Sequence, residues 1–303
     1  LVLSSRVPAS GGQNAPRVQT NSVAGRSGTP LAIVGMDVQL GGIDGLDAFA
    51  QSIYDGAQHF GPLPAKRWKG IKDDAPRGAY LDSFEIDFLR FKFPPKADDQ
   101  PTPQHLLLLK VADGAVRDAG LTEGGNVAVI VALGTELSLH QYRSRLDLSW
   151  QMSDALERAG VSLETDALNE VAKSAISPLA QVNQYTSYIG NIASSRVSAL
   201  WNFSGPAFTA SAGDNTVFKA LETARILLED PALDAVVIGA VDLAGGVENV
   251  TLRQSVHPVN DGAATLSFDQ RSNGWMAGEG AGAIVLKRQS DAQSQRIYAT
   301  VEG

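Results

Sequence analysis

The residues of this chain whose types and spacing could do chemistry gather around position 214, just before a helical pattern. Asp214 supplies a carboxylate, and a carboxylate at a helix N-terminus interacts favourably with the helix dipole and caps the first turn. Thr209, Ser211 and Thr216 supply hydroxyls, but a hydroxyl becomes a nucleophile only beside a positioned base, and the sequence offers no matching base. We therefore expect these hydroxyls to bind backbone amides. The residues predicted to form the turn are Ser211, Gly213, Asp214, Asn215 and Thr216.

The composition excludes several classes of site. None of the 303 residues is cysteine, which rules out a thiolate nucleophile, a disulfide framework and thiolate-rich metal sites. The formal net charge of −8 argues against general attraction to nucleic acid. No apolar run approaches the roughly 20 residues that span a bilayer. The glycine-rich runs 239–246 and 278–282 lack the strand, turn and helix of a dinucleotide site, so we expect no cofactor.

A layered fold must position the turn at Asp214. Short apolar runs at 30–36, 126–134, 235–241 and 282–286 are typical of strands buried on both faces, and we expect the first to lie in a parallel sheet. Helical spacing follows from Leu46 to Ile53, from Gln104 to Ala119 and from Val217 to Glu229, with glycine after the first two. Residues 143–176 are polar and are expected to form a surface excursion. The alternation predicts an α/β fold in which helices cover a mixed sheet.

The N-terminal 29 residues differ from the rest of the chain. They contain three arginines, no acidic residue and many Ser, Gly, Asn and Pro, which is typical of an inter-domain linker. A Ser- and Arg-rich leader is the alternative. The first residue is Leu1 and not Met, which favours a linker within a longer protein.

Segments spread along residues 30–303 resemble the N-terminal half of the β-ketoacyl synthase fold, in the thiolase superfamily. The run from Gly205 to Thr216 resembles the nucleophile turn of that family, in which a cysteine at a helix N-terminus is acylated. Asp214 stands where the resemblance places that cysteine. The C-terminal half, in which family members carry two active-site histidines and a lysine, is expected to be absent. The other matching segments are Ala32–Met36, Pro64–Trp68, Gly78–Asp82, Thr102–Leu109, Gly190–Ser198 and Phe268–Gly282.

Four histidines and one glutamate are further candidates for site residues. His59, His105, His140 and His257 do not match the family histidines by position. His105 replaces a family glutamine and is expected to be structural, whereas His140, after a strand, is the one that could line a pocket. Glu279 lies between glycines of a family signature and is expected to hold a turn.

The resemblance implies a cytoplasmic, catalytically silent domain that pairs with an active ketosynthase, as chain-length factors do. An acyl carrier protein, whose phosphopantetheine arm enters the partner's site, is the second implied partner. Two alternatives stay open. One is a malonyl decarboxylase or acyltransferase that acts through Asp214 or a hydroxyl, and the other is a vestigial docking domain in a multidomain synthase.

Overall fold

The computed structural model describes residues 29–302, except for residues 65–66, 69–74, 94–95, 97–98, 135–149, 162–165, 167–169, 171–182, 184–185 and 261–268. The predicted linker or leader therefore lies almost wholly outside the described residues. The same is true of His140 and Phe268. Within the predicted surface excursion at 143–176, residues 150–159 are helical and mostly exposed.

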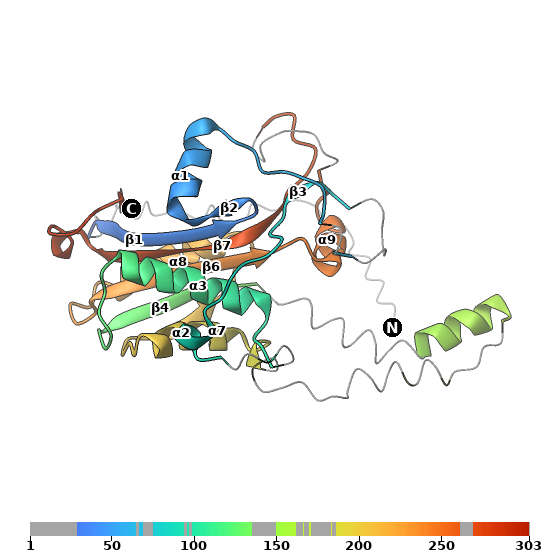
Figure 1. Cartoon of the computed structure of the whole chain (residues 1–303), viewed down its shortest axis with the longest axis horizontal. Helices are drawn as coiled ribbons and strands as arrows, with labels where there is room; N and C mark the ends of the chain where they lie inside the picture. The colour runs from blue at the N-terminus through green and yellow to red at the C-terminus, as the bar shows by residue number, and fades with distance from the viewer. Residues whose placement is uncertain are drawn as a thin grey trace, which may run out of the picture.

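A mixed β-sheet forms the centre of the fold (Figure 1). Over the described residues it has eight strands, with the order β2-β1-β7-β6-β4-β5, β8 beside β1 and β3 beside β7. β4, β5 and β6 run parallel to one another, and β7 runs antiparallel to both β6 and β1. The bounds are β1 Leu31–Leu40, β2 Ile43–Asp44, β3 Gly78–Ala79, β4 Val127–Ala132, β5 Ala207–Ala210, β6 Ala235–Leu243, β7 Ala277–Arg288 and β8 Ala299–Val301.

Both faces of the sheet are covered, which explains why its strands are continuous apolar runs in the sequence. All six residues of β4 are buried. Val129 and Val131 belong to one hydrophobic cluster, whereas Ala128 and Ile130 belong to another on the opposite face. The four predicted buried strands are confirmed. The expectation that the first lies in a parallel sheet is wrong, because β1 pairs antiparallel with β7, and burial on both faces does not encode strand direction.

Helices form a layer on each face (Figure 1). α3 and α7 contribute to the cluster on one face, and α8 contributes to the cluster on the other. α1 contacts β1 and β2. The bounds are α1 Gly45–Asp55, α2 Phe88–Phe91, α3 Pro103–Asp118, α7 Gly190–Leu200, α8 Thr216–Leu227 and α9 Val247–Gln254, with a 3-10 turn, η1, at Gln289–Asp291.

α3 is more deeply buried than its sequence pattern predicts. The pattern places Asp113 on a polar side, yet this residue is only 6% exposed. Its carboxylate pairs with the Arg90 guanidinium at 2.6 Å and with that of Arg117 at 2.9 Å. Arg90 belongs to α2, so this ion pair joins α2 to α3. Asp113 is therefore buried within an ion-paired cluster, whereas Arg117 and Asp118 on the same helix stay exposed.

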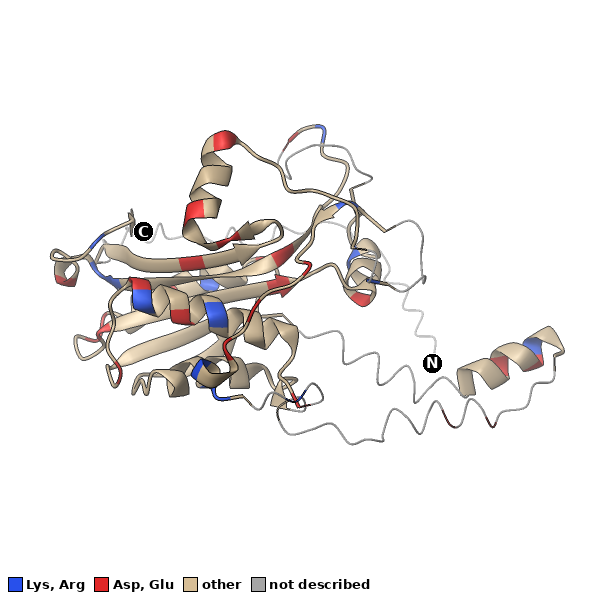
Figure 2. Ribbon diagram, in the orientation of Figure 1, with Lys and Arg blue, Asp and Glu red and all other residues tan. Residues whose placement is uncertain are grey.

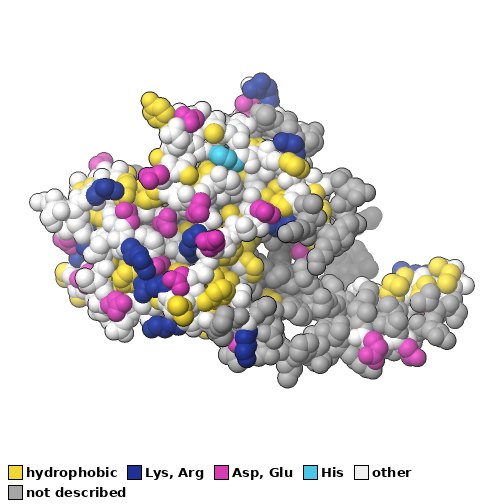
Figure 3. Space-filling model, viewed as in Figure 1, with side chains coloured by type: hydrophobic (Ala, Val, Ile, Leu, Met, Phe, Trp, Pro, Cys, Tyr) yellow, Lys and Arg dark blue, Asp and Glu magenta, His cyan; other side chains and the backbone are white. Residues whose placement is uncertain are grey.

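The surface carries charges of both signs. Basic and acidic residues both lie along α3 and around the sheet (Figure 2). The space-filling view shows the same mixture, with hydrophobic side chains scattered among the charges (Figure 3). The described residues on the visible face thus form no continuous basic surface of the kind that binds nucleic acid.

Candidate functional site

The turn predicted from the sequence connects β5 to α8, at the carboxyl end of an edge strand. In parallel α/β sheets this end of the strands is where ligands usually bind. Residues 211–215 are exposed, and Thr216 is buried. The structure therefore brings the five predicted residues together in one turn at the surface of the described part of the chain.

Thr216 and Gly213 hold the turn in shape. The Thr216 hydroxyl accepts a hydrogen bond from the Ala212 amide at 2.9 Å and donates one to the Gly213 carbonyl at 2.6 Å. Gly213 has a φ of +56°, a left-handed conformation that glycine adopts without a Cβ penalty. Thr209 donates its hydroxyl to the Gly190 carbonyl at 2.8 Å. The Thr216 hydroxyl thus binds a backbone amide, as expected from the sequence, whereas the Thr209 hydroxyl binds a backbone carbonyl and not the expected amide.

Two expectations about α8 are corrected. Asp214 is not the N-cap: Asn215 takes that position, without a side-chain cap bond, and Asp214 precedes it as an exposed residue. The predicted buried stripe of Val217, Leu221, Ala224 and Leu228 is wrong at its first residue, because Val217 is 40% exposed; Ala224 and Leu228 are buried as expected, and Ala220 is buried with them. The carboxylate is therefore presented to solvent and keeps its place beside the positive end of α8.

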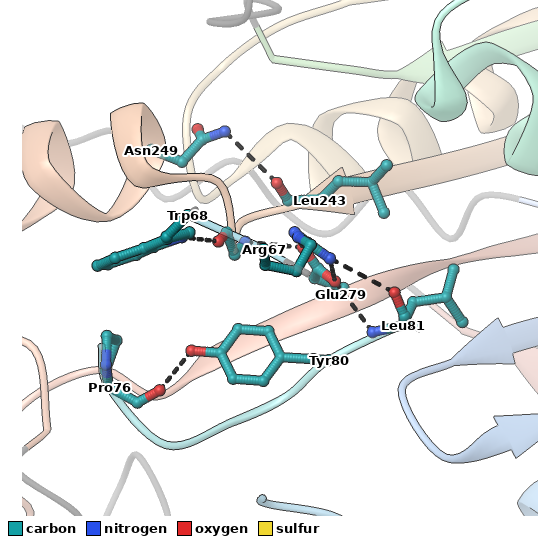
Figure 4. Close-up of polar contacts among 9 residues, drawn as sticks. Arg67, Trp68, Pro76, Tyr80, Leu81, Leu243, Asn249 and Glu279 are labelled. Carbon is teal, nitrogen blue, oxygen red and sulfur yellow. Dashed lines mark hydrogen bonds and ion pairs between the residues drawn. The ribbon is translucent and has the colours of Figure 1, made fainter. Parts of the chain in front are cut away.

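A second polar cluster centres on Glu279, at the start of β7 (Figure 4). Its side chain is 1% exposed. The Arg67 guanidinium donates to both carboxylate oxygens, at 2.6 and 3.1 Å. The amides of Leu81 and Gly245 donate to the same carboxylate at 2.9 and 3.0 Å. A buried carboxylate with four donors is fully satisfied, which agrees with the expected architectural role of Glu279.

The same cluster holds Trp68 in an unusual conformation. Trp68 has a φ of +57°, which is costly for a bulky side chain. Its indole N–H donates to the Gly245 carbonyl at 2.8 Å, and its side chain is buried. Tyr80 packs beside Gly245 and donates its hydroxyl to the Pro76 carbonyl. Burial, and next the charge of Glu279, raises the pKa of Tyr80, while the bond to Glu279 raises the pKa of Arg67.

The described histidines have different environments. His105 is 4% exposed at the start of α3, and burial, followed by the charge of Arg196, lowers its pKa from 6.5 to about 4. His59 shares a 2.6 Å hydrogen bond with the Ser52 hydroxyl at the end of α1. His257 is exposed after α9. Sequence reasoning expected His105 to be structural, but it did not connect this residue to Arg196, although Arg196 lies in the matching segment Gly190–Ser198.

The described residues do not form two other kinds of site. No group of three or more His, Asp or Glu side chains in that part of the chain is arranged to hold a metal ion. No described helix combines the length and apolarity needed to cross a membrane. The prediction that the chain uses no cofactor stays a prediction.

Comparison with known protein families gives a match over most of the chain. The family model for the β-ketoacyl synthase N-terminal domain matches residues 29–292. One of the polyunsaturated fatty acid synthase subunits of Thraustochytrium sp. is 38% identical over 291 residues, which cover 92% of this chain and 14% of the relative. Polyketide synthase ThaG from Burkholderia thailandensis is 28% identical and covers 90% of this chain. The chain spans a small part of these relatives, 14% and 4% of their lengths.

Solved structures agree in fold. A structure of the PfaC ketosynthase–chain length factor is similar with a TM-score of 0.79 and 43% identity, over 90% of this chain and 30% of that one. A ketosynthase from module 6 of the bacillaene synthase of Bacillus subtilis has a TM-score of 0.64 at 23% identity, over 89% of this chain and 42% of that one. The second similarity shows the thiolase-like arrangement of sheet and helices only.

Proposed function

This chain belongs to the β-ketoacyl synthase family, and we propose that it forms a non-catalytic, chain-length-factor-like domain of a fatty acid or polyketide synthase. The observation that carries the proposal is the turn between β5 and α8. It offers the exposed carboxylate of Asp214 beside a helix N-terminus, in a chain with no cysteine. The similarity to the PfaC ketosynthase–chain length factor supports the same interpretation.

Asp214 is a poor substitute for a thiol. Attack of its carboxylate on a thioester would expel the thiolate and leave an acyl anhydride, which hydrolyses too readily to hold a growing chain. Its negative charge also repels the carboxylate of a malonyl group. The hydroxyls of Thr209 and Thr216 are engaged with backbone groups and so are not poised as nucleophiles. The turn is therefore proposed to keep the family's shape without its condensation chemistry.

A role in partnership requires a surface that a second domain can contact. Within the described part of the chain, β5 has β4 on one side only and ends the sheet. Edge strands present backbone groups to which another strand can add. The Asn191 side chain accepts from the Thr209 amide at 3.1 Å and covers one of these groups, leaving the rest of the edge for a partner. We propose that an active ketosynthase docks on this side, next to the turn.

The remaining parts of the proposal follow from the same role. We propose that residues 30–303 form the ketosynthase-like unit, joined to its neighbours through a linker at 1–29. An acyl carrier protein would meet the unit together with the partner, because its phosphopantetheine arm has to reach the active thiol. The cytoplasm is the proposed location.

Co-expression with an active ketosynthase of the same synthase tests the proposal. A complex that survives size-exclusion chromatography is expected, with acyl transfer only when the partner's cysteine is intact. Persistent monomers would contradict it. Incubation of this chain alone with malonyl-carrier protein tests the decarboxylase alternative: release of carbon dioxide that Asp214→Ala abolishes would favour that alternative.

A further inference from the structure

The N-terminus of α3 gathers buried polar atoms that have no hydrogen-bond partner. Thr102, the N-cap, is 7% exposed, and neither its hydroxyl oxygen nor Nδ1 of His105, one turn later, is partnered. Nη1 of Arg196, from α7, is also buried and unpartnered. Buried polar atoms in native proteins almost always have a partner, because leaving one unsatisfied costs roughly 1–3 kcal/mol. The three atoms come from the start of α3 and from α7, which contacts it, and the charge of Arg196 acts on His105, so a single bound group could satisfy them.

The charges around this position favour an anion. Burial lowers the pKa of Arg196, and the charge of Asp99 opposes this shift. Among the described residues no carboxylate forms an ion pair with the guanidinium, whose Cζ lies 4.9 Å from the centroid of the Phe93 ring. Nη2 of Arg196 donates to neutral groups, the Asn183 side-chain oxygen at 3.3 Å and the Thr186 hydroxyl at 3.1 Å. Asp99 is itself engaged by the Asn183 amide at 3.0 Å. The first turn of the 16-residue α3 adds its positive end and its free amides.

We propose that Thr102, His105 and Arg196 bind one small inorganic anion, of the size of chloride, at the N-terminus of α3. The Thr102 hydroxyl, the Nδ1–H tautomer of His105 and Nη1 of Arg196 are the donors. A monatomic ion is proposed and not a larger oxyanion, because all three atoms are closed off from solvent and the smaller ion needs less space. The inference is independent of the proposed partnership with a ketosynthase.

Chloride dependence of the melting temperature of the 303-residue chain tests the proposal in solution. Chloride replaces gluconate at constant ionic strength, and a saturable rise of a few degrees is expected. Arg196→Gln is expected to flatten this response. Arg271→Gln is the matched control, because its side chain is 82% exposed and its loss should leave the response unchanged. Coincident chloride and gluconate curves for the unaltered chain would overturn the proposal.

Bromide in crystals of the unaltered chain gives a second readout that needs no variant. An anomalous peak within hydrogen-bonding distance of Arg196 Nη1 is expected. A water molecule there, with no anomalous signal at saturating bromide, would overturn the proposal. A bromide peak without a chloride-specific rise in melting temperature would mark an adventitious ion only and would equally overturn it.

Discussion

Replacing His105 with glutamine is expected to remove a specific part of the chain's sensitivity to acid. The pKa of His105 is lowered from 6.5 to about 4, first by burial and then by the charge of Arg196. Below pH 6.5 His105 is protonated in the unfolded chain, whereas in the folded chain it stays neutral until the pH approaches about 4. The stability that depends on neutral His105 is therefore fully present above pH 6.5 and lost progressively as the pH falls towards 4.

The size of the effect follows from the two pKa values. A difference of about 2.5 units, at about 1.4 kcal/mol per unit, corresponds to about 3 kcal/mol in total. Between pH 7 and pH 5 the expected loss is about 2 kcal/mol, since at pH 5 the unfolded histidine is almost fully protonated. Glutamine is neutral at both pH values and keeps a polar side chain of similar size.

Urea denaturation at pH 7 and pH 5, in gluconate without chloride, measures the difference. The unaltered chain is expected to lose about 2 kcal/mol more of its free energy of unfolding than His105→Gln over this interval. Any constant cost of the substitution cancels, because only the change with pH is compared. Parallel pH profiles for the two proteins would refute the reasoning.

Three further predictions concern the two polar sites. Glu279→Gln should lower the free energy of unfolding by about 3–5 kcal/mol, because a buried NH2 group then replaces an oxygen that accepts two N–H groups and Arg67 loses its counter-charge; urea denaturation measures the loss. Asp214→Cys should react with iodoacetamide faster at pH 7 than Ser211→Cys, because the start of α8 lowers the thiol pKa; equal rates measured by intact mass would count against this. Gly245→Ala places a Cβ 2.5 Å from a Glu279 oxygen and 2.7 Å from the Tyr80 ring, so it should lower the melting temperature at a cost of about 1–3 kcal/mol. Gly61→Ala, with nothing within 4 Å, should be neutral.

The sequence predicts those strands and helices whose apolar residues form a clear pattern. The runs that became β1, β4, β6 and β7 are continuous because both faces of the sheet are covered, and Gly56 ends α1 in the left-handed conformation expected of it. The family signatures likewise identified the fold. The direction of β1 could not be predicted, because burial on both faces is the same for parallel and antiparallel strands. β5 was not predicted, because it is only four residues long and has intermediate exposure throughout.

The turn before α8 could be predicted from the sequence, but the polar network around Glu279 could not. Neighbouring residues such as Gly213 and Thr216 act on one another locally, so their roles follow from turn and capping chemistry. Arg67 and Glu279 are 212 residues apart, and nothing in either neighbourhood specifies the other. The orphaned atoms of His105 and Arg196 depend in the same way on how α3 and α7 pack. Long-range polar pairs are therefore the part of the site that a single sequence leaves open.

The contacts of Glu279 also have a fixed order of availability during synthesis of the chain. The Glu279 carboxylate is synthesised after all three groups that bind it: the Arg67 guanidinium and the amides of Leu81 and Gly245. For Arg67 the separation is 212 residues. At about 5–20 residues per second, the first of these groups leaves the ribosome roughly 10–40 s before its acceptor. The segment around Arg67 thus has no contact to Glu279 while the 212 intervening residues are synthesised, and closing so long a loop makes this one of the late contacts to form.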